Sequence, residues 1–181
     1  MPALAQFSGY YSPGNWTTTH LPNAPTDQGS VDFSLAPASI TLIGSNTEQT
    51  APTFSALVFS IVAPASGTFS FNWAYTTNDS GDLDGPPFLW PFYDPASYVV
   101  NTQTQLTIDA GLQIQSGSIS VSVLQGDVIG FRIDSLDNFA GNATLTITNF
   151  MAPIPEPASV ALMSLGLLGV AVVAARRRRS N

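Results

Sequence analysis

The stretch that decides the fold is "GTFSFNWAYT", which runs from Gly67 to Thr76. Its aromatic residues stand at every second position: Phe69, Phe71, Trp73 and Tyr75. Because successive side chains of a β-strand point to opposite faces, this spacing places all four rings on one face. The pattern predicts a strand that buries its aromatic face and exposes the other.

The same alternation recurs on the C-terminal side of this stretch, in Ser118–Val123, Asp127–Asp134 and Asn142–Phe150. Weaker alternation marks four further candidate strands: Val31–Leu35, Ser39–Ile43, Phe54–Val62 and Gln105–Asp109. Gly117 and Gly126-Asp127 are typical of turns. No ten-residue window upstream of residue 155 shows helical periodicity with caps. We therefore expect an all-β fold, an antiparallel β-sandwich of about eight strands with a jelly-roll-like arrangement.

The last residues have a different composition, with Pro155-Glu156-Pro157, an apolar run at 158–175 and four consecutive arginines at 176–179. As a helix the apolar run would be roughly 27 Å long, close to the bilayer core of about 30 Å. It is predicted to be a single C-terminal transmembrane helix. Arginines flanking a span stay on the cytoplasmic side, so the preceding domain would lie outside. The alternative is a buried C-terminal helix of the globular fold.

This order of Pro-Glu-Pro, apolar span and arginine cluster resembles the PEP-CTERM sorting signal of Gram-negative bacteria. The resemblance implies export across the inner membrane and recognition by an exosortase, a membrane-embedded enzyme that removes the tail. It assigns the sorting motif to Pro155, Glu156, Pro157, Arg176, Arg177, Arg178 and Arg179. It also implies a mature form on the outer surface or in the extracellular matrix, associated with exopolysaccharide or biofilm. The region from Phe69 to Ala152 is similar to exported proteins of this group that have no assigned activity.

An exported domain needs a signal peptide, and Ala3-Leu4-Ala5 matches the A-x-A pattern of a signal-peptidase site. The alternative is that small residues meet here by chance. The predicted organisation is a signal remnant at 1–5, a β-sandwich domain at 6–150, a linker at 151–154 and the sorting tail at 155–181.

The charge distribution excludes several classes of partner. The formal net charge is −7, and of five Lys and Arg residues only Arg132 lies outside the tail. An acidic body repels phosphate backbones, so nucleic acid is not an expected partner. The chain has no cysteine and one histidine, His20, which excludes thiolate chemistry and a histidine metal cluster. His20 lies in a segment rich in Pro and Thr and is expected to be a solvated loop residue.

One loop carries two candidate binding features. Four aspartates gather in it, Asp79, Asp82, Asp84 and Asp94, and carboxylates on a glycine-punctuated loop are typical calcium ligands. Residue 91 is proline where an EF-hand loop needs a bidentate glutamate, so the site would be a sandwich-loop calcium site, with Asp134 or Asp137 as helpers. The alternative is a solvated acidic loop. Calcium is the one cofactor that the sequence suggests.

The same loop holds four aromatic residues: Phe88, Trp90, Phe92 and Tyr93. Aromatic faces beside polar groups can stack on sugar rings, which makes these residues candidate glycan ligands. The alternative is that they cover an open end of the sandwich.

Catalysis has weaker support. A glycosidase needs two facing carboxylates, which sequence alone cannot place, and a Ser-His-Asp site would depend on His20. We therefore expect no catalytic residues. The sequence predicts an exported, non-enzymatic cell-surface or matrix protein. A carbohydrate-binding module, calcium-dependent or not, is the alternative, and a secreted hydrolase is a more distant third.

Overall fold

The computed structural model describes residues 3–22, 29–47, 54–78, 94–108, 112–136, 138 and 141–155. Within these residues the chain forms eleven β-strands and two short 3-10 helices. The described part has no helix whose length and hydropathy would suit a membrane crossing. The predicted span at 158–175 lies outside it.

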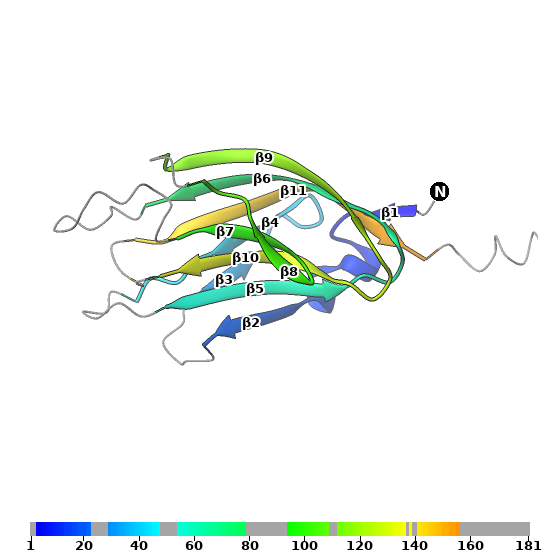
Figure 1. The fold of residues 1–181 in the computed structure, drawn as a ribbon, viewed down its shortest axis with the longest axis horizontal. Coiled ribbons are helices and arrows are strands. Elements are labelled where there is room, and N and C mark those ends of the chain that lie inside the picture. The colour runs from blue at the N-terminus through cyan, green and yellow to red at the C-terminus, as the bar shows by residue number, and fades with distance from the viewer. Residues whose placement is uncertain are drawn as a thin grey trace, which may run out of the picture.

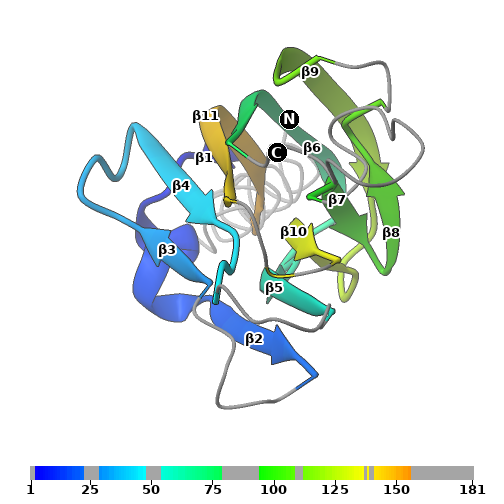
Figure 2. The same cartoon turned by 90° about the vertical axis from the view of Figure 1, so that its left-hand side faces the viewer.

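The strands form two antiparallel sheets that face each other (Figures 1 and 2). The six-stranded sheet has the order β3 (Ser30–Asp32), β4 (Ser39–Ile43), β11 (Ala143–Ile154), β6 (Gly67–Thr77) and β9 (Ile114–Val123), with β1 (Ala3–Ala5) also paired to β11. The five-stranded sheet has the order β2 (Thr17–Leu21), β5 (Ser55–Val62), β10 (Val128–Ser135), β7 (Ala96–Val100) and β8 (Thr102–Gln105). From β4 to β7 and from β8 to β11, successive strands alternate between the sheets. The predicted all-β, jelly-roll-like sandwich is confirmed.

The core lies between the sheets and follows the alternation of the sequence. The four aromatic residues that mark β6 are all buried, none more than 8% exposed. Opposite them, β10 contributes Phe131, whose ring lies 5.0 Å from that of Phe71 in an edge-to-face arrangement. Aromatic pairs of this geometry add stability beyond the area that they bury. The period of two in the sequence therefore corresponds to the inner faces of the sheets.

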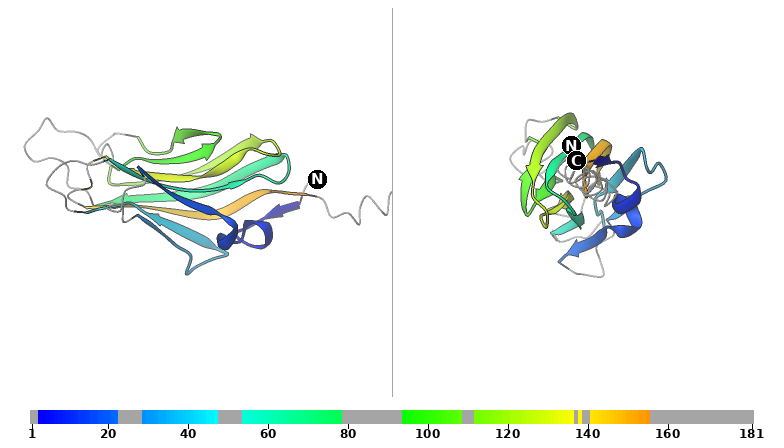
Figure 3. Two further views of the ribbon diagram at one scale, coloured as in Figure 1. Left: turned by 90° about the horizontal axis from the view of Figure 1, so that it is seen from below. Right: turned by 90° about the vertical axis from the view of Figure 1, so that its right-hand side faces the viewer.

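An N-terminal segment closes one end of this core (Figure 3). It contains the 3-10 helices η1 (Gly9–Tyr11) and η2 (Pro13–Asn15) and buries Phe7, Tyr11 and Trp16. The Trp16 ring stacks on Phe59 at 4.7 Å, and Phe7 stacks on Phe150 at 4.3 Å. We call this the tail end, because β11 reaches it and Pro155 follows there.

The opposite end, the loop end, is where β6 finishes at Thr77 and β11 begins at Ala143, which are register partners. Strand β7 starts at the same end, just after Asp94, whose side chain accepts a hydrogen bond from Thr77 (Figure 1). The length of β11 thus separates Pro155 from Thr77 and Asp94, the described residues near the two ends of the predicted binding loop.

Several predicted boundaries were wrong. Gly117 is no turn, because it lies within β9 opposite Trp73, where a Cβ atom would come within 2.9 Å of the indole nitrogen. Gly126, with φ +94°, does occupy a turn. The strand expected at Gln105–Asp109 is instead β8 at Thr102–Gln105, an exposed edge strand whose polar residues give no alternation.

The linker expected at 151–154 is part of β11. A register shift between Thr148 and Met151, with Asn149 at φ 49°, interrupts the alternation there and hides the continuation of the strand. His20 lies in β2 and pairs with Leu57, so the prediction of a loop position was wrong. The strand carries little hydrophobic alternation because four of its five residues are exposed. Ala3-Leu4-Ala5 forms β1, and its cleavage from a precursor stays a prediction.

Candidate functional site

The tail end fixes the residues that precede the Pro-Glu-Pro motif. Ala152, Pro153 and Ile154 of β11 pair with Ala5, Leu4 and Ala3. The Tyr11 hydroxyl donates a hydrogen bond of 2.8 Å to the Pro153 carbonyl. Burial raises the pKa of Tyr11, and the neighbouring Tyr10 adds to the effect, so the phenol stays protonated and remains a donor.

Pro155 comes directly after this fixed strand and is exposed. It borders a groove lined by Gln6, Ser8, Gly9, Tyr10, Met151, Ile154 and Pro155. The Tyr10 hydroxyl on this groove donates to the Val62 carbonyl at 3.0 Å. The first proline of the Pro-Glu-Pro motif is thus accessible at the border of this groove. Glu156, Pro157 and the four arginines lie outside the described residues.

At the loop end, the structure describes Asp94 of the predicted calcium ligands, and this side chain is 1% exposed. Its carboxylate Oδ2 accepts a hydrogen bond from Thr77 Oγ1 at 3.3 Å, and its carbonyl accepts one from the Tyr75 hydroxyl at 2.8 Å. Asp94 therefore ties the end of β6 to the start of β7. Asp79, Asp82, Asp84 and Asp137, together with the aromatic candidates Phe88, Trp90, Phe92 and Tyr93, lie outside the described residues. The part of the chain that the structure describes brings no three potential metal ligands together.

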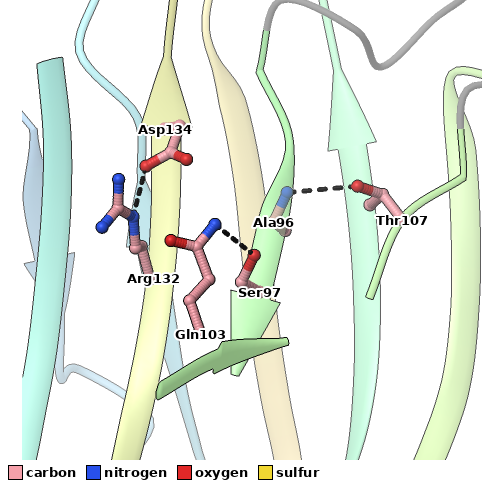
Figure 4. A network of polar contacts seen from close by, with 6 residues as sticks. All are labelled: Ala96, Ser97, Gln103, Thr107, Arg132 and Asp134. Carbon is pink, nitrogen blue, oxygen red and sulfur yellow. Dashed lines mark hydrogen bonds and ion pairs between the residues drawn. The ribbon is translucent and has the colours of Figure 1, made fainter. Parts of the chain in front are cut away.

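A polar network lies on the outer face of the five-stranded sheet (Figure 4). Arg132 and Asp134 are two residues apart on β10, so both point away from the core-facing Phe131 and Ile133. Arg132 Nε donates to Asp134 Oδ1 at 2.6 Å, and the two side chains are 19% and 7% exposed. Burial raises the pKa of Asp134, against the opposing effect of its hydrogen bonds and the Arg132 charge.

Two neighbouring strands complete the network. Ser97 of β7 is the register partner of Arg132, and Gln103 of β8 donates from Nε2 to Ser97 Oγ at 3.2 Å. On the other side, the guanidinium carbon of Arg132 lies 6.0 Å from the centre of the Phe54 ring, which is 43% exposed. Within the described residues, the terminal N–H groups of Arg132 have no hydrogen-bond acceptor.

This arrangement exposes the neutral amide of Gln103 beside a guanidinium whose charge is balanced by Asp134, whereas Ser97 is buried. Such a set can bind hydroxyl groups without attracting a highly charged molecule. In the sequence, Arg132 stands out only by its charge and Asp134 only as a possible calcium helper, and nothing marks Ser97 or Gln103. Strand β10 must pair with the β7–β8 hairpin, which is distant from it in sequence, before these residues meet, so period and spacing carry no signal of the network.

Comparisons with known proteins give one family match. Residues 153–179 match the PEP-CTERM protein-sorting motif. No protein of curated function matches the sequence.

Among solved structures, similar folds include a family 35 carbohydrate-binding module from Clostridium thermocellum, with 12% identity over 81% of this chain and 97% of that chain, at a TM-score of 0.31. A family 35 module of Cellvibrio japonicus has 17% identity over 78% and 100%, at a TM-score of 0.33. The C-terminal family 6 module of a laminarinase from Zobellia galactanivorans has 15% identity over 75% and 100%, at 0.32. Likenesses this distant do not carry the ligands of those modules over to this chain.

The matched motif begins at Pro153, within the last residues of β11, and continues through the proline pair, the apolar run and the arginines. The predicted resemblance is thereby confirmed. The chain is a β-sandwich that carries a PEP-CTERM protein-sorting motif at residues 153–179.

Proposed function

We propose that this protein is a non-enzymatic component of the cell surface or extracellular matrix, associated with exopolysaccharide. The carrying observation is the position of the sorting motif, which starts at the end of a strand that is fixed to the body by β1 and Tyr11. In this proposal the exosortase acts at an accessible segment beside the folded domain. The apolar run then spans the inner membrane, with Arg176–Arg179 on the cytoplasmic side.

The position of the two ends supports display of the domain. A tail that leaves at one end of the sandwich holds that end close to the membrane, while the loop end is directed away from it. The long connection that carries the predicted calcium and glycan ligands joins strands at the loop end. A matrix partner would therefore meet that end before the tail is removed, and after removal the whole surface would be accessible.

The roles of the described carboxylates support a function without catalysis. Asp134 is held by Arg132 and Asp94 by Thr77. Asp127 accepts hydrogen bonds from the Leu124 backbone and the Asn101 amide, and Asp32 accepts one from the Ser34 backbone. Each of these four aspartates stabilises a turn, a strand end or a strand pair, so each has a structural role that requires no catalytic one.

The proposal can be tested with a precursor that carries a signal peptide in front of residue 1, expressed with and without an exosortase. We expect the body to be digested by protease added outside the inner membrane. We also expect the tail to be removed only when the exosortase is present. Replacing Glu156 with Gln and Pro157 with Ala should block removal, whereas the matched replacement of Pro153 with Ala, before the motif's proline pair, should permit it. A body protected inside the cell, or removal that is independent of the exosortase, would contradict the proposal.

A second candidate function is favoured by the network on the outer face of the five-stranded sheet. We propose that this face binds a neutral polysaccharide, because the Arg132–Asp134 pair is internally balanced and the exposed polar group beside it is the neutral amide of Gln103. A polyanionic glycan would be repelled by a chain of net charge −7.

Affinity electrophoresis through gels that contain neutral or uronate-bearing polysaccharides tests this candidate. We expect retardation by a neutral polymer, weakened in Gln103→Ala. The matched control is Asn72→Ala, an exposed amide on the other sheet. Equal retardation of both variants would place binding elsewhere.

A further inference from the structure

The four outermost strands of the two sheets differ in length. The five-stranded sheet ends in β2 and β8, of five and four residues, and one side of the six-stranded sheet ends in β3, of three residues. The other side ends in β9, which has ten residues. Short edge strands limit pairing with other chains, and a long one invites it.

In the described residues the β9 edge lacks three features that usually block such pairing: a bulge, a charged residue and a proline. Its register with β6 is continuous over ten pairs, from Gly67 with Val123 to Thr76 with Ile114, without a bulge. Its sequence "IQSGSISVSV" contains no charged residue and no proline. In the described residues β6 is its one strand partner, and β9 lies at the edge of the sheet (Figures 1 and 2). Alternate N–H and C=O groups of an edge strand point away from its partner.

Exposed apolar side chains stand at both ends of this edge. Ile114, at the start of β9, is 73% exposed, and Leu124, directly after its end, is 67% exposed. These are two of the three most exposed large hydrophobic residues in the described part of the chain. Pairing of another strand along this edge would remove both apolar side chains from water.

We propose that β9 pairs with β9 of a second copy of this chain, antiparallel about a two-fold axis at Ile119. In that register Ser118 faces Ser120 of the second copy, and Gly117 faces Val121. Ile114 of each copy faces Leu124 of the other, so the two-fold axis gives two such contacts and covers all four exposed side chains. The two six-stranded sheets would form one continuous sheet.

The self-complementarity of the segment identifies the partner as a second copy. A two-fold interface uses the same surface on both subunits, so an exposed apolar residue of one copy should face an exposed apolar residue of the other. Ile114 and Leu124 satisfy this requirement because they lie five residues to either side of Ile119. The absence of charge from Ile114 to Leu124 also lets two chains of net charge −7 approach along this edge without direct opposition of like charges.

The chain has no cysteine, so introduced cysteines report the register without background. Directly opposed residues have Cα atoms about 4.5–5.5 Å apart, which a disulfide can bridge, whereas diagonal neighbours are about 7–8 Å apart. We expect oxidation of a mixture of full-length Ser118→Cys and Ser120→Cys chains in mild detergent to give disulfide-linked dimers. Each variant alone should give several-fold fewer. Thr104→Cys, on the short edge strand β8, is the control and should stay uncrosslinked.

A second measurement does not depend on disulfide geometry. Sedimentation equilibrium of the full chain should show a two-chain species that is lost in the Ser118→Lys, Ser120→Lys double variant. Asn72→Lys, on the same face but one strand further in, should keep it. A chain that is monomeric at every concentration, or a dimer that the lysines on β9 leave intact, would overturn the inference. Neither result depends on tail processing or glycan binding, so the inference stands or falls separately from the proposed function.

Discussion

The tail end and the loop end of the sandwich are closed by different chemistry. At the tail end Phe7, Tyr11 and Trp16 fill the space between the sheets with aromatic rings. At the loop end the buried side chains are largely polar, among them Ser55, Thr77, Asp94, Asp134 and Asn138. Aromatic packing contributes stability roughly in proportion to the area it buries, whereas buried polar groups stabilise only when their hydrogen bonds are made. The two ends should therefore respond differently to substitution, to ions and to pH.

Strand β10 shows the contrast within a few residues. Asp127, just before the strand at the tail end, is partly exposed, and hydrogen bonds from the Leu124 backbone and Asn101 lower its pKa. Asp134, near the strand's other end, is buried, and burial raises its pKa. The pKa of an aspartate carboxyl is thus lowered at one end of the strand and raised at the other.

The largest expected effect is at the aromatic end. Trp16→Ala removes a ring that stacks on Phe59 and Phe131, and the free energy of unfolding should fall by about 3–5 kcal/mol. Urea unfolding followed by circular dichroism measures the change. Ser55→Ala at the loop end, which removes one hydrogen bond to Asn138, should cost about 1 kcal/mol. Equal losses in the two variants would mean that the ends do not differ in this way.

Calcium should act at the loop end alone. If Asp79, Asp82 and Asp84 bind the ion, calcium at a hundredfold excess over its dissociation constant should stabilise the chain by about 2.7 kcal/mol. That corresponds to a rise in melting temperature of several degrees, measured by a thermal scan with calcium and with chelator.

Asp82→Asn and Asp84→Asn should lose the rise, whereas Asp127→Asn at the tail end should retain it. Magnesium should have a smaller effect because it requires a tighter octahedral site. Identical melting temperatures with calcium and with chelator would leave the loop as a solvated acidic surface.

A smaller effect is expected where the tail end does contain a buried hydrogen bond. Tyr11→Phe keeps the ring and leaves the Pro153 carbonyl without its donor, so unfolding should become easier by about 1–3 kcal/mol. Tyr10→Phe removes a hydrogen bond on the exposed groove and should change stability by less than about 0.5 kcal/mol. Denaturant unfolding of both variants compares them, and a larger loss in Tyr10→Phe would reverse the assignment of the buried donor.

The two aspartates of the β10 region should give pH dependences of opposite sign. Because the pKa of folded Asp127 lies below its value of 3.8 in the unfolded chain, its contribution is present above pH 3.8 and is lost as the pH falls through the folded pKa. The folded pKa of Asp134 lies above 3.8, so folding binds protons there, and the free energy of unfolding falls as the pH rises from 3.8 through the raised pKa.

Urea unfolding between about pH 3 and pH 7 separates the two effects. Asp127→Asn should reduce the loss of stability at the acidic limit. Asp134→Asn should remove the decline in stability above pH 3.8, and a profile unchanged in both variants would contradict both assignments.

The strongly alternating strands were predictable from the sequence because one of their faces is buried and the other is not. β6 and β10 are of this kind, and their boundaries differ from the predicted ones by one residue at most. The strands β2 and β8 were missed or misplaced because edge strands with exposed faces need no alternation. In β11 the register shift after Thr148 hides the last residues of the strand.

The sequence by itself determined the class of the fold and the sorting motif, because both depend on local features: a period of two, a proline pair, an apolar run and adjacent charges. Only the tertiary structure decided which residues meet across strands. It joined Arg132 and Asp134 to Ser97 and Gln103, it placed Gly117 under Trp73, and it fixed Pro153 beneath Tyr11 before the motif leaves the body. It also left β9 as a long uncovered edge. These contacts depend on strand order and register, which long-range packing selects and no local pattern records.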